Sequence, residues 1–152
     1  MKKLLALICT VILLNTTYGQ TCEEREKELL TTVGSFSAGY LYNTYGMIGS
    51  ISDGFVHNAY DAETVNDLLK AQNNLLEHLT NTMENLVKGQ FLTDSVDIRY
   101  AGSAALVLKG LKKQSELLME YVKNKSKQKS DAYDEQRSKN WKEISRLMGL
   151  KD

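Results

Sequence analysis

The chain has 152 residues, with 19 basic and 19 acidic side chains, two cysteines and no proline. A net charge of zero does not favour nucleic-acid binding, which usually needs a dense basic surface. Two cysteines cannot build a disulfide scaffold, and the lack of proline favours long helices, in whose interior a proline costs about 3 kcal/mol.

Residues 1–19 have the pattern of an export signal. Two lysines open the segment, residues 4–14 form an apolar middle, and residues 17–19 end it with a small-residue cleavage pattern. The apolar run is too short for a membrane-spanning helix, which needs about 20 residues. We therefore expect a mature protein, residues 20–152, that is periplasmic or secreted.

Cys22 is the one cysteine left after removal of this signal. It has no internal partner in the mature chain, so the only disulfide it could form is an intermolecular one. A free thiol and a lipid-linked thiol are the alternatives. The charge is uneven, because residues 20–122 carry eight basic and fourteen acidic side chains, whereas residues 123–152 carry nine and five.

The most informative stretch is 29–52, which is 24 residues long and has no charge. It holds nine apolar residues, three tyrosines, four glycines and eight serines, threonines or asparagines. A solvated helix normally carries lysine and glutamate, so this segment must lie against protein, lipid or a partner. We expect a helix over 22–58 with one apolar side. Its other side, which we call the neutral face, consists of Ser35, Gly39, Tyr42, Asn43, Gly46 and Ser50.

Two more helices are predicted from apolar residues at helical spacing. The clearest covers 61–88, where apolar residues, most of them leucine, form a wide stripe at helical spacing between Asp61, a good N-cap, and Gly89, a stop signal. The next is expected over 93–124. Small residues at 101–105 in its first half permit a close approach of another helix.

The lysines of 123–130 place like charges four residues apart, which disfavours a helix, so we expect a basic linker there. A last amphipathic helix is predicted over 131–148, ending at Gly149. Three long helices and one short helix with short connections predict an all-α fold, an antiparallel bundle that forms a single domain over 20–152.

Common catalytic and metal-binding patterns are missing from the sequence. In an antiparallel hairpin His57 and His78 would lie about 21 Å apart, too far to share a metal. No glutamate stands three residues before either histidine, and there is no Cys-x-x-Cys-His, no Gly-x-Ser-x-Gly and no phosphate-binding glycine loop. We therefore expect no catalytic residue, no metal ligand and no cofactor.

Gln72 interrupts the leucine stripe of the second helix. Antiparallel counting places it level with Gly49 on the first helix and close to Gly110 on the third. A glutamine between two glycine-bearing segments favours a buried, hydrogen-bonded layer that fixes the register of the helices. A small polar pocket is the alternative.

Together these features favour an exported, non-catalytic protein that acts by binding another protein, as an adaptor, a chaperone-like factor or an assembly subunit. The partner would be a second copy or another envelope component, and the tyrosines are suitable contact residues.

Two alternative functions stay open. Residues 29–52 exceed the length of a spanning helix and could insert into a membrane, although their polar residues dilute the hydrophobicity. Glycines between helices could also leave room for a small apolar ligand.

Overall fold

The computed structural model describes residues 21–150, and the export signal predicted over 1–19 lies outside them. The described part is helical and contains no strand, which confirms the all-α prediction. Its elements are α2 (Cys22–Val56), α3 (Ala62–Lys88), α4 (Ser95–Lys123) and α5 (Lys127–Met148).

Residues 21–33 form a unit of their own, the first turns of α2. A capping box closes their start: the Thr21 N–H donates to Glu24 Oε2 at 2.8 Å, and the Glu24 N–H donates to Thr21 Oγ1 at 3.1 Å. Cys22, in the first turn, is an exposed free thiol. An intermolecular disulfide at this residue stays a prediction.

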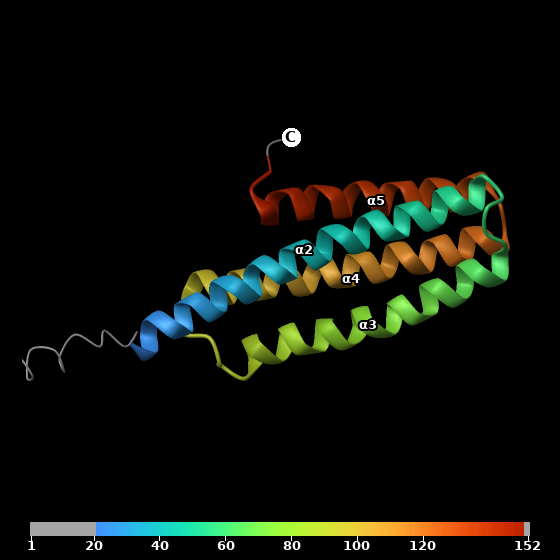
Figure 1. Cartoon of the computed structure of the whole chain (residues 1–152). Coiled ribbons are helices and arrows are strands. Elements are labelled where there is room, and N and C mark those ends of the chain that lie inside the picture. Colours follow the sequence, from blue (N-terminus) through green and yellow to red (C-terminus); the bar gives the residue numbers. More distant parts are fainter. Residues whose placement is uncertain (1–20, 151–152) are drawn as a thin grey trace, which may run out of the picture. The chain divides into compact units, whose positions relative to one another are not determined.

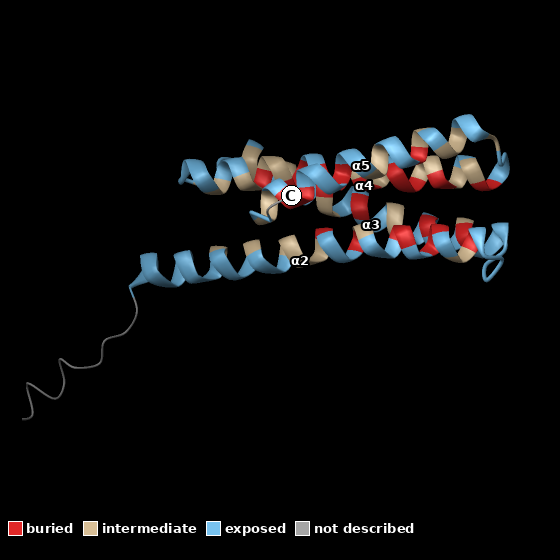
Figure 2. Ribbon diagram, turned by 90° about the horizontal axis from the view of Figure 1, so that it is seen from above, coloured by how far each residue is buried: buried red, intermediate tan, exposed pale blue. Residues whose placement is uncertain are grey.

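Residues 34–150 form the second unit, in which four helices pack against each other and successive helices run in opposite directions (Figure 1). α4 packs against both α3 and α5. The buried residues recur along each helix on the side that faces its neighbours (Figure 2). This arrangement follows from the sequence, since apolar residues every three or four positions give each helix one apolar stripe to bury.

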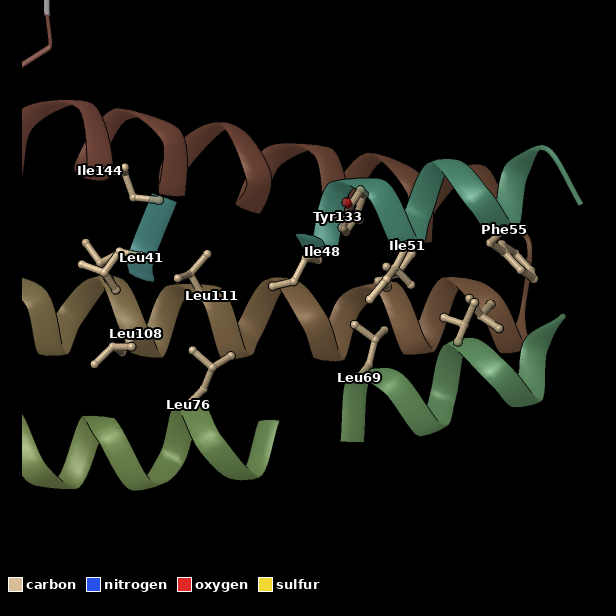
Figure 3. Packing of buried hydrophobic residues seen from close by; sticks show 14 of the residues in the cluster. Leu41, Ile48, Ile51, Phe55, Leu69, Leu76, Leu108, Leu111, Tyr133 and Ile144 are labelled. Atoms are coloured by element: carbon tan, nitrogen blue, oxygen red, sulfur yellow. The ribbon is translucent and has the colours of Figure 1, made fainter. Parts of the chain in front are cut away.

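The core of this unit consists mainly of branched aliphatic side chains contributed by all four helices (Figure 3). Leu41 and Ile48 of α2 are at most 1% exposed, and Leu76 of α3, Leu111 of α4 and Ile144 of α5 are fully buried. Burying such a side chain stabilises a fold by roughly 1.5–3 kcal/mol, so these contacts are the main source of stability.

Several of the predicted helix ends agree with the structure because these ends have a local cap. Asp61 accepts a hydrogen bond from the Thr64 N–H at 2.8 Å, and Gly89 follows the last residue of α3. Asp94 caps α4 in the same way. Gly149 ends α5 in the left-handed region, at φ +65°, which a glycine adopts without strain.

The connection between α4 and α5 is only 124–126, much shorter than the basic linker predicted over 123–130. α5 therefore begins four residues before the expected start at 131. Ion pairs offset the repulsion between the lysines. Lys129 pairs with Glu120 of α4, and Lys127 pairs with an aspartate one turn later at 2.8 Å.

Candidate interaction surface

The neutral face lies on the outside of α2. Its residues Ser35, Tyr42, Asn43, Gly46 and Ser50 are exposed, and Gly39 is half-buried. A Cβ atom added at either of its two glycines would meet no atom within 4 Å. The small residues of 101–105 do not cover it: the alanines of that stretch are themselves buried in the bundle.

At one edge of the neutral face, its residue Tyr42 and two further aromatic residues, one on α2 and one on α5, meet at the surface. The ring of Trp141 on α5 lies 5.5 Å from the ring of Tyr45 and 6.2 Å from that of Tyr42, between centroids, and both pairs are tilted. Tyr42 is 46% exposed and Trp141 is 36% exposed. We call Tyr42, Tyr45 and Trp141 the aromatic patch.

Helical spacing and a glycine bring these rings together. Tyr42 and Tyr45 are three residues apart on α2, so they share the side of the helix that faces α5. Arg137, one turn before Trp141, lies 5.9 Å from the centre of the Tyr45 ring. A Cβ at Gly49 would come within 3.3 Å of the Arg137 guanidinium, so the missing side chain lets α5 approach α2 closely.

Arg137 adds a positive charge to the edge of the aromatic patch. Partial burial lowers the pKa of Arg137. The neighbouring Tyr45, Tyr133 and the carboxylate of Asp53 raise it by more than burial lowers it, so the pKa lies above its ordinary value. The guanidinium therefore stays charged and can donate hydrogen bonds to a partner.

The predicted layer of Gln72, Gly49 and Gly110 does not form. Gln72 Nε2 donates to Tyr40 Oη at 2.8 Å and so joins α3 to α2, whereas the atoms nearest to a Cβ at either glycine belong to α5. The antiparallel count extended the first helix to residue 58, began the second at residue 61 and placed the turn at 60–61, so it did not treat 57–61 as the connection. Residues 57–61 form the α2–α3 connection, which moves the position level with Gln72 toward the start of α2.

A different set of polar side chains is buried between α4 and α5. Asn140 Nδ2 donates to Gln114 Oε1 at 2.8 Å, and Gln136 Nε2 donates to Asn140 Oδ1 at 2.9 Å. Gln114 is fully buried and Asn140 is 3% exposed. Gly110 makes room for them, since a Cβ there would lie 2.3 Å from Asn140 Oδ1. We call Gln114, Gln136 and Asn140 the amide layer.

Four buried polar atoms of α4 and α5 find no hydrogen-bond partner in the described part of the chain: Gln114 Nε2, Ser115 Oγ, Tyr133 Oη and Ser145 Oγ. Tyr133 lies near Gln114 and near Ser52 of α2, yet it makes no well-formed hydrogen bond with either. Burial raises the pKa of Tyr133, so its hydroxyl stays protonated at neutral pH. Such atoms lose their hydration without compensation, which weakens the packing around them.

The sequence held a signal for the amide layer that our reading missed. Gln114 falls between Leu111 and Leu118 on the buried side of α4, and Asn140 falls between Tyr133 and Ile144 on that of α5. A polar residue at such a position is expected to be buried and paired, as for Gln72. The contact of Trp141 with α2 had no such signal, because sequence periodicity does not show which helices are neighbours.

Other chemistry in the described residues is sparse. They contain no group of three or more His, Cys, Asp or Glu side chains placed to hold a metal ion. A hollow between α4 and α5 is lined by Arg99, Tyr100 and Arg146, but Arg146 is already paired with Glu143. None of the described helices, including α2 with its uncharged segment, is both long and apolar enough to cross a membrane.

No protein-family model, no curated protein and no solved structure matches this chain. Its function must therefore be inferred from its own residues. Of these, the aromatic patch and the neutral face beside it are the most distinctive surface features.

Proposed function

We propose that this chain is an exported, non-catalytic helical protein that binds another protein through the aromatic patch and the adjoining neutral face. The observation that carries the proposal is the meeting of three aromatic rings and Arg137 at the surface between α2 and α5. An adaptor, a chaperone-like factor or an assembly subunit would use such a surface, and the pattern of residues 1–19 supports export.

The composition of the patch supports this function. Tryptophan, tyrosine and arginine are the residues that most often dominate the binding energy of protein interfaces. Here the rings of Tyr42, Tyr45 and Trp141 already pack against each other, so a partner would immobilise few further side-chain rotors on binding. Tyr42 and Trp141 still expose part of each ring.

The neutral face suits the margin of the same contact. Its glycines carry no side chain, so the backbone of a partner can approach α2 closely there. Asn43 and Ser50 are exposed and can exchange hydrogen bonds with water for hydrogen bonds with a partner. The segment 29–52 has no charge, so none of its own side chains is an ion that must be desolvated when a partner covers it.

Affinity capture with matched variants tests the proposal. The full chain with a C-terminal tag is expressed in its own organism, and co-purifying proteins are quantified for the wild type, Trp141→Ala, Tyr42→Ala and Phe91→Ala. Phe91 is the control, an aromatic residue that is 71% exposed in the α3–α4 connection and lies on neither of the helices that form the patch. Circular dichroism establishes that each variant folds.

The proposal predicts one protein that co-purifies with the wild type and with Phe91→Ala. Its yield should fall by about tenfold or more with Trp141→Ala and Tyr42→Ala, the effect of removing a hot-spot side chain. Equal yields from all four chains, or no specific protein from any of them, would contradict it.

A further inference from the structure

α5 buries an unusually polar surface. Its four buried residues are Tyr133, Asn140, Ile144 and Ser145. Asn140 and Ser145 have polar side chains, and Tyr133 has a hydroxyl group on its ring, so only Ile144 is entirely apolar. α3 also buries four residues, but three of them are aliphatic. Polar contacts replace contacts with water at little net gain, so α5 is held to its neighbours less strongly than its length suggests.

The interface of α5 also contains polar atoms without partners. Gln114 Nε2 of α4 and the hydroxyls of Tyr133 and Ser145 are buried and unpaired in the part of the chain that the structure describes. Water would satisfy all three if α5 moved away. Their hydration therefore favours release of α5 and opposes the apolar contacts that keep it in place.

α5 is, by contrast, well equipped to remain a helix by itself. Ser126 caps its start and Gly149 its end. Three ion pairs at i,i+3 or i,i+4 spacing lie within it: Lys127–Asp131, Lys139–Glu135 and Arg146–Glu143. The ion pair from Lys129 to Glu120 is the single one found between α5 and another described helix.

These observations concern the same helix that carries Trp141. We propose that α5 detaches reversibly as one unit from α2 and α4, and that its detachment separates Trp141 from Tyr42 and Tyr45 and so turns off the aromatic patch. The regulatory consequence rests on the proposed binding function. The motion itself rests on the packing of α5 alone.

Hydrogen exchange of the full chain, read by mass spectrometry without a partner, tests the motion. The amides of α5 should exchange together, at about tenfold or higher rates than those of α3 and α4, because they open without unfolding of the other helices. α5 amides that exchange as slowly as those of α3 and α4 would overturn the proposal.

A disulfide that fixes α5 to α4 supplies the matched control. A Cβ at Gly110 would lie 3.3 Å from Asn140 Cγ, a separation close to that between one Cβ and the partner sulfur in a disulfide. In Cys22→Ser/Gly110→Cys/Asn140→Cys, oxidation should slow exchange in α5 to the rate of α4, and reduction should restore the fast rate. If this variant does not fold, the wild-type exchange pattern decides alone.

The two proposals fail separately. Fast exchange in α5 together with equal capture by all chains in the Trp141 experiment would leave the motion and remove the binding function. Capture that depends on Trp141 together with slow exchange in α5 would leave the binding function and remove the switch. If the oxidised form of the disulfide variant captures more partner than its reduced form, this result would support both the binding function and the switch.

Discussion

The ring of Trp141 on α5 packs against that of Tyr45 on α2, with centroids 5.5 Å apart and planes tilted by 34°. Two helices that are far apart in the chain thus share one exposed aromatic surface. The surface exists only while α5 stays on the bundle, and the hydrogen bond from Asn140 to Gln114 in the amide layer is one of the contacts that hold it there.

A double-mutant cycle on this pair should show strong coupling. Asn140→Leu leaves Gln114 Oε1 buried without its donor, so we expect a loss of about 1–3 kcal/mol in the free energy of unfolding. Gln114→Leu/Asn140→Leu removes both amides and should cost less than the sum of the two single changes. Urea unfolding measures these values, and strictly additive losses would show that the pair is not coupled.

Two glycines of α4 should respond to alanine with opposite signs. At Gly102 a Cβ meets nothing within 4 Å, so Gly102→Ala should stabilise the protein by about 0.5–1 kcal/mol through helix propensity. At Gly110 the Cβ would displace the buried amide of Asn140, a strain of about 1–3 kcal/mol that exceeds this gain. Melting temperatures should rise for the first variant and fall for the second; a rise for both would mean that Asn140 is free to move.

Acid should weaken the contact of α3 with α4 at Glu84. Hydrogen bonds and attraction from Lys109 and then Lys88 lower the pKa of Glu84 from 4.5 to about 2. A carboxyl with a lowered pKa stabilises the folded state above pH 4.5, and this contribution is lost as the pH falls from 4.5 toward 2.

Glu84→Gln is the variant that isolates this effect. Its melting temperature should lie below that of the wild type at pH 7, and the difference should shrink as the pH approaches 2. Salt at about 1 M should reduce the difference as well, because exposed charges are screened. A difference that stays constant from pH 7 to pH 2 would assign the loss to packing.

Gln72→Leu should have little effect. Gln72 is half-buried, and the substitution removes its hydrogen bond to Tyr40. The new leucine would gain apolar contact on the side of α3 that carries Leu68 and Leu75. We expect a stability within about 1 kcal/mol of the wild type. Partner capture should be unchanged. Unfolding, or loss of capture by a folded variant, would each show a larger role for Gln72.

The helices were predictable because the information that specifies them is local. Asp61, Asp94 and Gly149 lie at the ends of apolar periodic segments, and each acts within one turn of its own position. The start of α5 was missed for a related reason. The repulsion among its lysines is visible in the sequence, whereas the attraction of Lys129 to Glu120 depends on a second helix.

The candidate site was only partly predictable. The composition of 29–52 indicated the neutral face, which the structure places on the outside of α2. Its aromatic neighbour Trp141 and the amide layer both depend on the register between α5 and the helices beside it. The connection before α5 is 124–126 and not the predicted 123–130, and a difference of a few residues there shifts this register by about a turn. Periodicity within one helix carries no information on that register.

Site-specific photo-cross-linking in the organism itself tests the binding surface most directly. A photoreactive phenylalanine analogue replaces Tyr42 in the aromatic patch or, as the control, Phe91 in the α3–α4 connection. We expect a discrete cross-linked protein from position 42 that is absent from position 91. Identical products from both positions, or none from position 42, would contradict this prediction.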